Sequence, residues 1–194
     1  MNAIVVIAGS AGSLEPMRQI VAALPASCTA SIFIVVHIGN NPSVLPWILK
    51  QHGRLAAEFP TDGTVIKAGH IYVAPPDRHM ILDHGVVRLT QGDKVHYTRP
   101  AADPLFFSAA AAYGDQVMGI VLSGGDGDGA EGLRAIKKHG GTALVQHPDE
   151  AAQPSMPYAA MKADHPEAWL RTDEIAERVL AFCADRPNAS TGYS

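Results

Sequence analysis

The chain has 194 residues, of which 47% are hydrophobic and 18% charged, and its formal net charge is −4. This length suits one domain with a substantial core, and the acidic balance gives no basic footprint for binding nucleic acid. We expect a cytoplasmic protein without membrane insertion, because no apolar stretch reaches the roughly 18 residues of a membrane span and the N-terminus lacks the features of a signal peptide.

The first predicted element is a strand that begins at Ile4, an apolar run that ends in small residues. A helical pattern begins directly afterwards with Ser13 as a candidate N-cap, so Ser10 is expected at a tight strand-to-helix turn. A serine there points into the crevice at the carboxyl end of the strand, where helix-opening N–H groups can hold an oxyanion. Taken alone, this stretch favours an ordinary turn of small residues over a nucleophile.

A second buried strand is predicted over residues 32–36 and ends at His37. Both strands of a βαβ unit end at the same edge of a parallel sheet, so Ser10 and His37 are expected to share a crevice. A loop over residues 39–42 leads into the next helix. Short β-like runs over residues 65–66, 70–74, 80–83 and 86–90 are separated by turn signals, which predicts a small antiparallel insertion between residues 56 and 90 with at least one hairpin.

The remainder of the chain alternates between helices and buried strands. Helices are expected over residues 104–113, 130–139 and 172–184, together with a short helix that ends at residue 162. Strands are expected over residues 117–122 and 142–145 and near 168–170. This alternation predicts an α/β fold, a three-layer, doubly wound and mainly parallel sheet with a small antiparallel hairpin insertion. We expect one domain over residues 1–184, followed by a flexible C-terminal tail over 185–194.

Three residue types used in acyl transfer, Ser10, His37 and Asp128, each follow a predicted buried strand. In such enzymes a serine attacks, an imidazole takes its proton and a carboxylate orients the imidazole, and their order along the chain is free. Each also has a structural interpretation, since backbone groups could satisfy His37 and Asp128 could cap the next helix. Their coincidence at one edge of one sheet favours catalysis.

Other kinds of site are less well supported. Asp126 and Asp128 resemble the start of a calcium loop, but the required glutamate does not follow at the right distance. The turn over residues 9–12 lacks two glycines of the dinucleotide fingerprint. The other histidines form no helical pair with metal-ligand spacing, and Cys28 and Cys183 match no metal or redox spacing. We therefore expect neither a metal nor an organic cofactor.

Taken together, these motifs resemble the catalytic domain of the CheB-type chemoreceptor methylesterases, also called protein-glutamate methylesterases. The resemblance extends from Val5 to about Leu180 and rests on the order of six stretches, residues 10–13, 36–37, 69–80, 99–106, 122–129 and 155–157. It implies a hydrolase of chemotaxis signalling in which Ser10 attacks a glutamate methyl ester, His37 takes its proton and Asp128 orients His37. It also implies deamidation of receptor glutamines.

The resemblance and the turn together define a wider site. The expected oxyanion and site-shaping residues are Ala11, Gly12, Gly125, Asp126, Arg99 and Met156. Ala11 offers a backbone N–H to the oxyanion, whereas Arg99 is assigned to substrate positioning or site support on the resemblance alone. Gly125 replaces a methionine of the family pattern, and Asp126 replaces a glycine. A second carboxylate this close to Asp128 could raise a pKa or bias the imidazole.

The implied partner is the methylated cytoplasmic domain of a chemoreceptor, with room for a methyltransferase or another signalling protein. Family members commonly carry an N-terminal receiver domain, whereas Met1 lies three residues before the first predicted strand. We therefore expect either a stand-alone esterase or a piece cut from a longer protein. Two alternatives stay open: a serine esterase of the same fold that acts on another ester or methylated protein, and a non-catalytic interaction module.

Overall fold

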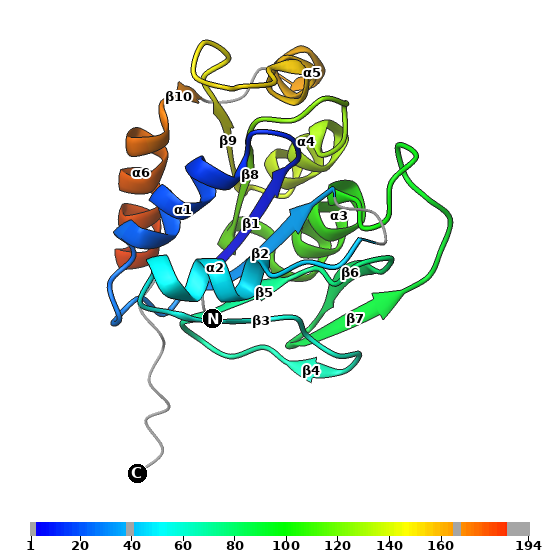
Figure 1. Ribbon diagram of the computed structural model, residues 1–194, viewed down its shortest axis with the longest axis vertical. Helices are drawn as coiled ribbons and strands as arrows, with labels where there is room; N and C mark the ends of the chain where they lie inside the picture. Colours follow the sequence, from blue (N-terminus) through cyan, green and yellow to red (C-terminus); the bar gives the residue numbers. More distant parts are fainter. Residues whose placement is uncertain (1–2, 38–40, 165–167, 186–194) are drawn as a thin grey trace.

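The computed structural model describes residues 3–37, 41–164 and 168–185, and Figure 1 shows a central sheet with helices on both faces. All pairings in this sheet are parallel, in the order β10-β9-β8-β1-β2-β5-β3. Its strands are β1 (Ile4–Gly9), β2 (Ser31–Val36), β3 (Ala56–Glu58), β5 (His70–Val73), β8 (Val117–Val121), β9 (Thr142–Gln146) and β10 (Ala168–Leu170). The helices are α1 (Leu14–Ala23), α2 (Leu45–His52), α3 (Ala102–Tyr113), α4 (Ala130–Lys138), α5 (Ser155–Asp164) and α6 (Thr172–Ala184), with a short 3₁₀ turn, η1 (Gly114–Gln116), after α3.

Side chains that alternate along the buried strands build a core on each face of the sheet. On β1, Val5 and Ile7 join one core, whereas Val6 and Ala8 join the other. The first core lies under α1, α2 and α6, and the second lies under α3, α4 and α5. The three-layer, mainly parallel α/β fold is therefore confirmed.

The insertion is smaller than predicted, because β3 and β5, which lie between residues 56 and 90, belong to the main sheet. Only β4 (Thr64–Val65), β6 (His79–Asp83) and β7 (Val86–Thr90) form the small antiparallel sheet, in the order β4-β7-β6. The expected insertion strand at His70 is instead β5, which pairs in parallel with β2 and β3 inside the main sheet. The reason is burial on both faces: Ile71, Tyr72 and Val73 are at most 1% exposed, which is typical of an interior parallel strand.

The winding of the sheet creates a crevice at the carboxyl ends of β1 and β8. These two strands are neighbours, yet α1, which follows β1, covers one face and α4, which follows β8, covers the other. Such a switch point leaves the strand ends open between diverging loops, and ligands of open α/β sheets bind there. Ser10 and the glycine-rich loop after β8 both lie at this crevice.

Two further expectations concern the ends and the surface of the chain. In the part of the chain that the structure describes, no helix is both long and apolar enough to cross a membrane. Apart from Asp185, the expected tail lies outside the described residues, as do positions 39 and 40 of the predicted loop. The division into a domain and a tail stays a prediction.

Candidate active site

Ser10 lies on the turn between β1 and α1. Its amide donates to the carbonyl of Ser123 (2.9 Å), and its carbonyl accepts from the amide (3.1 Å) and the hydroxyl (2.7 Å) of Ser13. Ser13 occupies the N-cap position of α1 as expected, but its hydroxyl makes no cap hydrogen bond because the turn uses it. Glycine is needed at position 9, since a Cβ there would overlap the Ser13 side chain. The backbone on both sides of Ser10 is thus fixed.

The start of the loop after β8 holds this turn from the other side. The Ser123 hydroxyl donates to the carbonyl of Ala11 (2.7 Å) and accepts from the amide of Gln153 (2.9 Å). The Ser123 amide donates to Oε1 of Gln146 (2.9 Å), and both side chains are buried. The sequence pattern does not single out Ser123 or Gln146, because single polar residues at strand ends are common and their partners are distant in sequence.

Two amide groups at the opening of α1 are available to a ligand. Among the hydrogen bonds of the described residues, none uses the amide N–H of Ala11 or Gly12, whereas that of Ser10 is taken by Ser123. Both residues are exposed. Gly12 has φ +81, which favours glycine, and a Cβ there would approach the hydroxyl of Ser123 to 2.8 Å. Free amides that lead into a helix favour negative charge, so this turn can stabilise an oxyanion.

His37 is the lateral neighbour of Ser10. Because Gly9 of β1 is paired with Val36 of β2, the residues that follow them emerge side by side at the same edge. The His37 amide donates to the Gly9 carbonyl (3.2 Å), which extends the pairing beyond the strands. In the described structure no hydrogen bond joins the Ser10 hydroxyl to His37. Such bonds are often long without substrate and tighten in the reacting complex.

The imidazole of His37, whose side chain is only 6% exposed, lies between two carboxylates. Its Nε2 lies 2.6 Å from Oδ2 of Asp128, in a hydrogen bond. Its Nδ1 lies 2.8 Å from Oδ2 of Asp126, at ion-pair distance but without the alignment of a hydrogen bond. Burial lowers the pKa of His37, but the two carboxylates outweigh this and raise that pKa to about 9. At neutral pH this arrangement holds His37 as an imidazolium.

Asp126 is the more exposed of the two carboxylates, at 31% for its side chain. Its Oδ1 accepts from the amide of Asp128 (3.0 Å), which shapes the loop. Burial raises the pKa of Asp126, but contact with His37 outweighs this and holds the pKa below its usual value. Asp126 therefore covers the one ring nitrogen of His37 that Asp128 leaves free.

Asp128 is fully buried, and its carboxylate lies against the N-terminus of α3. Oδ1 accepts from the amide of Asp103 (3.0 Å), and Oδ2 accepts from the amide of Ala102 in addition to contacting His37. The amides at a helix N-terminus favour a charged carboxylate. Asp128 therefore caps α3 rather than α4, the helix that follows it in sequence, and these bonds fix its orientation toward His37.

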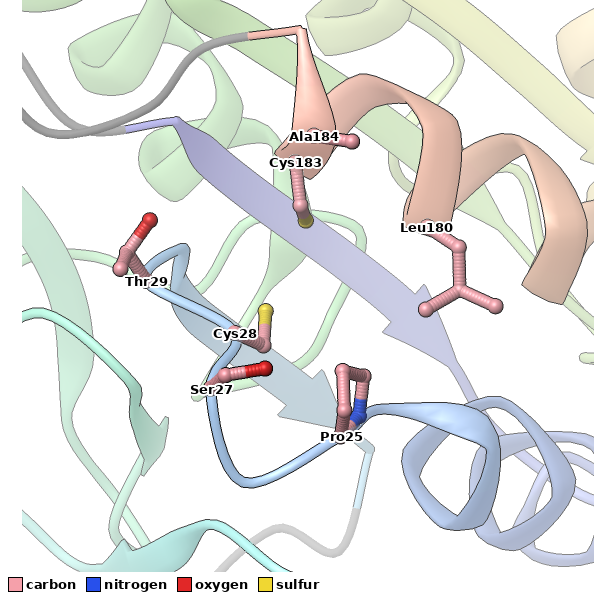
Figure 2. Close-up of a pocket in the computed structure, with 7 residues that line it drawn as sticks. All are labelled: Pro25, Ser27, Cys28, Thr29, Leu180, Cys183 and Ala184. Carbon is pink, nitrogen blue, oxygen red and sulfur yellow. The ribbon is translucent and has the colours of Figure 1, made fainter.

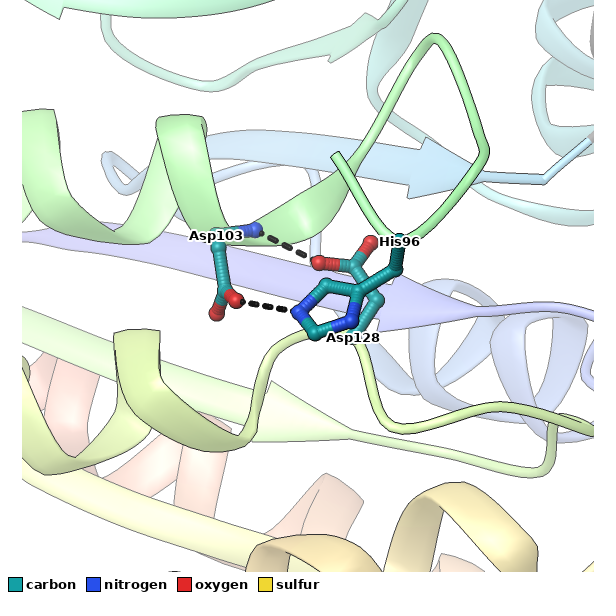
Figure 3. A group of neighbouring side chains, drawn as sticks. All are labelled: His96, Asp103 and Asp128. Atoms are coloured by element: carbon teal, nitrogen blue, oxygen red, sulfur yellow. Dashed lines mark hydrogen bonds and ion pairs between the residues drawn. The ribbon is translucent and has the colours of Figure 1, made fainter. Parts of the chain in front are cut away.

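Asp103 completes a reciprocal arrangement, because its carboxylate lies at the N-terminus of α4. Oδ1 accepts from the amides of Gly129 (3.1 Å) and Gly132 (2.8 Å), and Oδ2 lies 3.0 Å from Nε2 of His96 (Figure 3). Burial and the charge of Asp128 raise the pKa of Asp103. Ligand atoms of His96, Asp103 and Asp128 lie within 4.8 Å of one another, a spacing that metal sites also show. Here every carboxylate oxygen already accepts from a protein group, which accounts for the cluster.

Met156 lies beneath the glycine-rich loop. Its side chain is buried, and its amide donates to the carbonyl of Gly124 (3.0 Å). A Cβ at position 124 would overlap the sulfur of Met156 and approach the Cβ of Ser10 to 3.0 Å. A Cβ at Gly125 would meet nothing within 4 Å. Gly124 is thus required by packing, whereas Gly125 leaves open space beside the site.

Replacing Gly124 with alanine should displace Met156 or Ser10. We expect the melting temperature to fall by several degrees, since overpacking costs about 1–3 kcal/mol, and hydrolysis of a small ester to fall in parallel. Gly125→Ala is the matched control and should leave both unchanged. Thermal unfolding followed by circular dichroism, together with ester turnover, measures the pair, and equal effects of the two variants would contradict this account of the loop.

Arg99 forms contacts that support loops near the site. Its guanidinium donates to Oδ1 of Asp77 through Nε (2.9 Å) and Nη2 (2.7 Å), and to the carbonyl of Gly92 through Nη1 (2.8 Å). These hydrogen bonds hold the pKa of Asp77 below its usual value. Arg99 thereby joins the segment after β5 to the segment after β7. Contact between Arg99 and a substrate stays a prediction.

A cavity of about 450 Å³ opens beside His37, between the first turn of α1 and the start of α2. Its lining is mostly apolar and includes Leu14, Val36, Val44 and Ile48. Apolar walls next to a few polar groups are typical of ligand sites. The cavity can therefore receive a small side chain next to the imidazole.

Comparison with known proteins identifies the family. The CheB methylesterase family model matches residues 5–179. The chain belongs to this family. The catalytic domain of Thermotoga maritima CheB methylesterase superposes with a TM-score of 0.88 at 27% identity, covering 93% of this chain and 98% of that domain.

Two relatives extend this finding to CheB methylesterases of different lengths. A protein-glutamate methylesterase/protein-glutamine glutaminase of Anaeromyxobacter dehalogenans is 37% identical over 183 residues, which cover 92% of this chain and 53% of that protein. A Leptospira interrogans relative is 36% identical over 176 residues, covering 89% of this chain and 91% of its own length. The chain is thus a member of a hydrolase family whose proteins include longer and similarly short chains.

Proposed function

We propose that this chain hydrolyses glutamate methyl esters on chemoreceptors, with Ser10 as nucleophile, His37 as base and Asp128 as the group that orients His37. The observation that carries the proposal is the adjacency of Ser10 and His37 at the ends of paired strands, with His37 held by the buried Asp128. Membership of the CheB methylesterase family supports the reaction class. The names of the relatives support both ester hydrolysis and glutamine deamidation.

The mechanism begins with a neutral His37. Because Asp128 engages Nε2, the proton of Ser10 passes to Nδ1 as the serine oxygen attacks the ester carbon. The amides of Ala11 and Gly12 stabilise the tetrahedral oxyanion. His37 then returns the proton to the departing methoxide, which leaves as methanol. Water attacks the acyl-enzyme by the same route and releases the glutamate.

Asp126 sets a condition on the first step. While its carboxylate lies against Nδ1, that nitrogen stays protonated and cannot accept a proton from Ser10. Asp126 is partly exposed and can rotate toward solvent, so a substrate that enters the crevice can displace it. His37 can accept the proton of Ser10 once the carboxylate of Asp126 has moved away from Nδ1.

The test is methanol release from a methylated cytoplasmic fragment of a chemoreceptor, with Ser10→Ala as the matched inactive variant. We expect release by the wild type and a loss of several orders of magnitude in the variant, since the remaining groups alone give little acyl transfer. A fragment with glutamine at the same position should release ammonia. Intact hydrolysis of small esters without methanol release would refute the receptor substrate.

One observation favours a second candidate function on the same scaffold. Gly125 leaves open space where the family pattern has a methionine, so the crevice can admit an ester other than that of a receptor glutamate. A panel of small esters and methylated proteins distinguishes the two functions, with Gly125→Met as the diagnostic variant. If the substrate is a different ester, Gly125→Met should lower its turnover and spare a glutamate methyl ester. A phosphonate probe that adds no mass at Ser10 would instead indicate a non-catalytic module.

A further inference from the structure

Cys28 and Cys183 meet at the edge of the molecule opposite the candidate active site. Cys28 lies in the loop just before β2, at the amino end of the strands, whereas Ser10 and His37 lie at their carboxyl ends. Cys183 lies in the last turn of α6. Figure 2 shows their sulfur atoms directed toward each other from the loop and the helix. The sequence spacing suggests no pair, because only the packing of α6 brings the two together.

The two thiols share one cavity. Both cysteines are free and buried, at 7% and 8% exposure, and each thiol shifts the pKa of the other. They line a cavity of about 440 Å³ together with Pro25, Ser27, Thr29, Leu180 and Ala184. A small reagent that enters this cavity therefore meets both sulfur atoms.

The surroundings distinguish the two sulfurs chemically. The neighbouring Cys183 side chain, opposed by burial and assisted by the backbone at Ala30, lowers the pKa of the Cys28 thiol. The same pairing, together with burial, raises the pKa of Cys183. Since thiolates are the reactive form, Cys28 is the attacking sulfur and Cys183 the resolving one.

We propose that Cys28 and Cys183 form a redox-active dithiol, which a small disulfide oxidises to an intramolecular bond. The Cys28 thiolate attacks one sulfur of the small disulfide, forming a mixed disulfide and expelling one thiolate. Cys183, after losing its proton to solvent, attacks Cys28 and expels the second thiolate. Two protein thiols are oxidised and one small disulfide is reduced to two thiols.

The new bond would tie the end of α6 to the loop before β2. It closes a loop of most of the chain, which restricts the unfolded ensemble, so we expect the melting temperature to rise by several degrees. The bond lies at the opposite edge of the sheet from Ser10 and His37, so ester hydrolysis should be unchanged.

The test exposes the native protein to oxidised glutathione and follows intact mass. We expect the wild type to lose two hydrogen atoms with no retained glutathione, and peptide mapping to join Cys28 to Cys183. In Cys183→Ala the glutathione adduct should persist on Cys28. In Cys28→Ser any adduct on Cys183 should form more slowly than the adduct on Cys28 forms in Cys183→Ala. A stable adduct on the wild type, two unmodified thiols, or a bond between two molecules would overturn the proposal. Thermal unfolding of each untreated variant checks that it is folded.

Discussion

Asp128→Asn is expected to lower kcat for ester hydrolysis by about 10⁴-fold, the scale seen when a triad carboxylate becomes an amide. An asparagine has one oxygen for the amides of Ala102 and Asp103, so its NH₂ group turns toward His37. That group donates to Nε2, which leaves the ring proton on Nδ1, the nitrogen that must accept from Ser10. Steady-state kinetics on a small ester measures the loss.

Circular dichroism must accompany this measurement, because Asp128 also caps α3. The informative result is a variant that keeps its secondary structure, still reacts slowly with a serine-directed phosphonate and has lost turnover. If a folded Asp128→Asn protein retained activity within tenfold of the wild type, another carboxylate would have to orient His37.

Asp126→Asn is expected to have the opposite effect and to raise activity at neutral pH. Asparagine can keep the hydrogen bond from the amide of Asp128 through Oδ1 while removing the charge beside Nδ1 of His37. The pKa of His37 then falls from about 9 toward its usual range. Because His37 must be neutral to act as base, kcat/KM at pH 7 should rise about tenfold for each unit by which this pKa falls.

The measurement is the pH dependence of kcat/KM for wild type and Asp126→Asn between pH 5 and pH 10. In the wild type the acidic limb should lie near pH 9, and in the variant it should move to lower pH. Asp149→Asn, which removes a carboxylate that is 81% exposed, is the control for net charge and should leave the limb in place. An unmoved limb in Asp126→Asn, or a loss of activity, would show that Asp126 does not restrain the base.

The sequence predicts the α/β layering well because buried parallel strands leave continuous apolar runs. Residues 4–7 and 32–36 are such runs, and they are observed as β1 and β2. The segment at His70 has the same character, but it stands in a row of short β-like runs separated by turn signals, so its place beside β2 depends on tertiary pairing. Local pattern therefore identifies the main strands better than it separates a short interior strand from a hairpin.

The site shows the same division between local and tertiary information. Polar residues just beyond buried strands select Ser10, His37 and the loop that bears Asp128, because the edge of a parallel sheet is common to all its strands. The pairing of Asp128 with α3 and of Asp103 with α4 depends on which helix ends meet in space. The spacing of residues along the chain does not indicate that each aspartate caps the other's helix. Nor does it indicate that Ser123 holds the Ser10 turn.

Because His37 lies between Asp126 and Asp128, its contribution to folding stability and its ability to act as the proposed base change in opposite directions with pH. A histidine with a pKa of about 9 in the folded chain and about 6.5 in the unfolded chain stabilises the fold fully below about pH 6.5, and this contribution is lost as pH rises through about 9. The base becomes active over the same upper range. His37 therefore contributes most to stability at the pH values where it is least able to act as the proposed base. A bound substrate that moved Asp126 away would relieve this opposition without any other change in the fold.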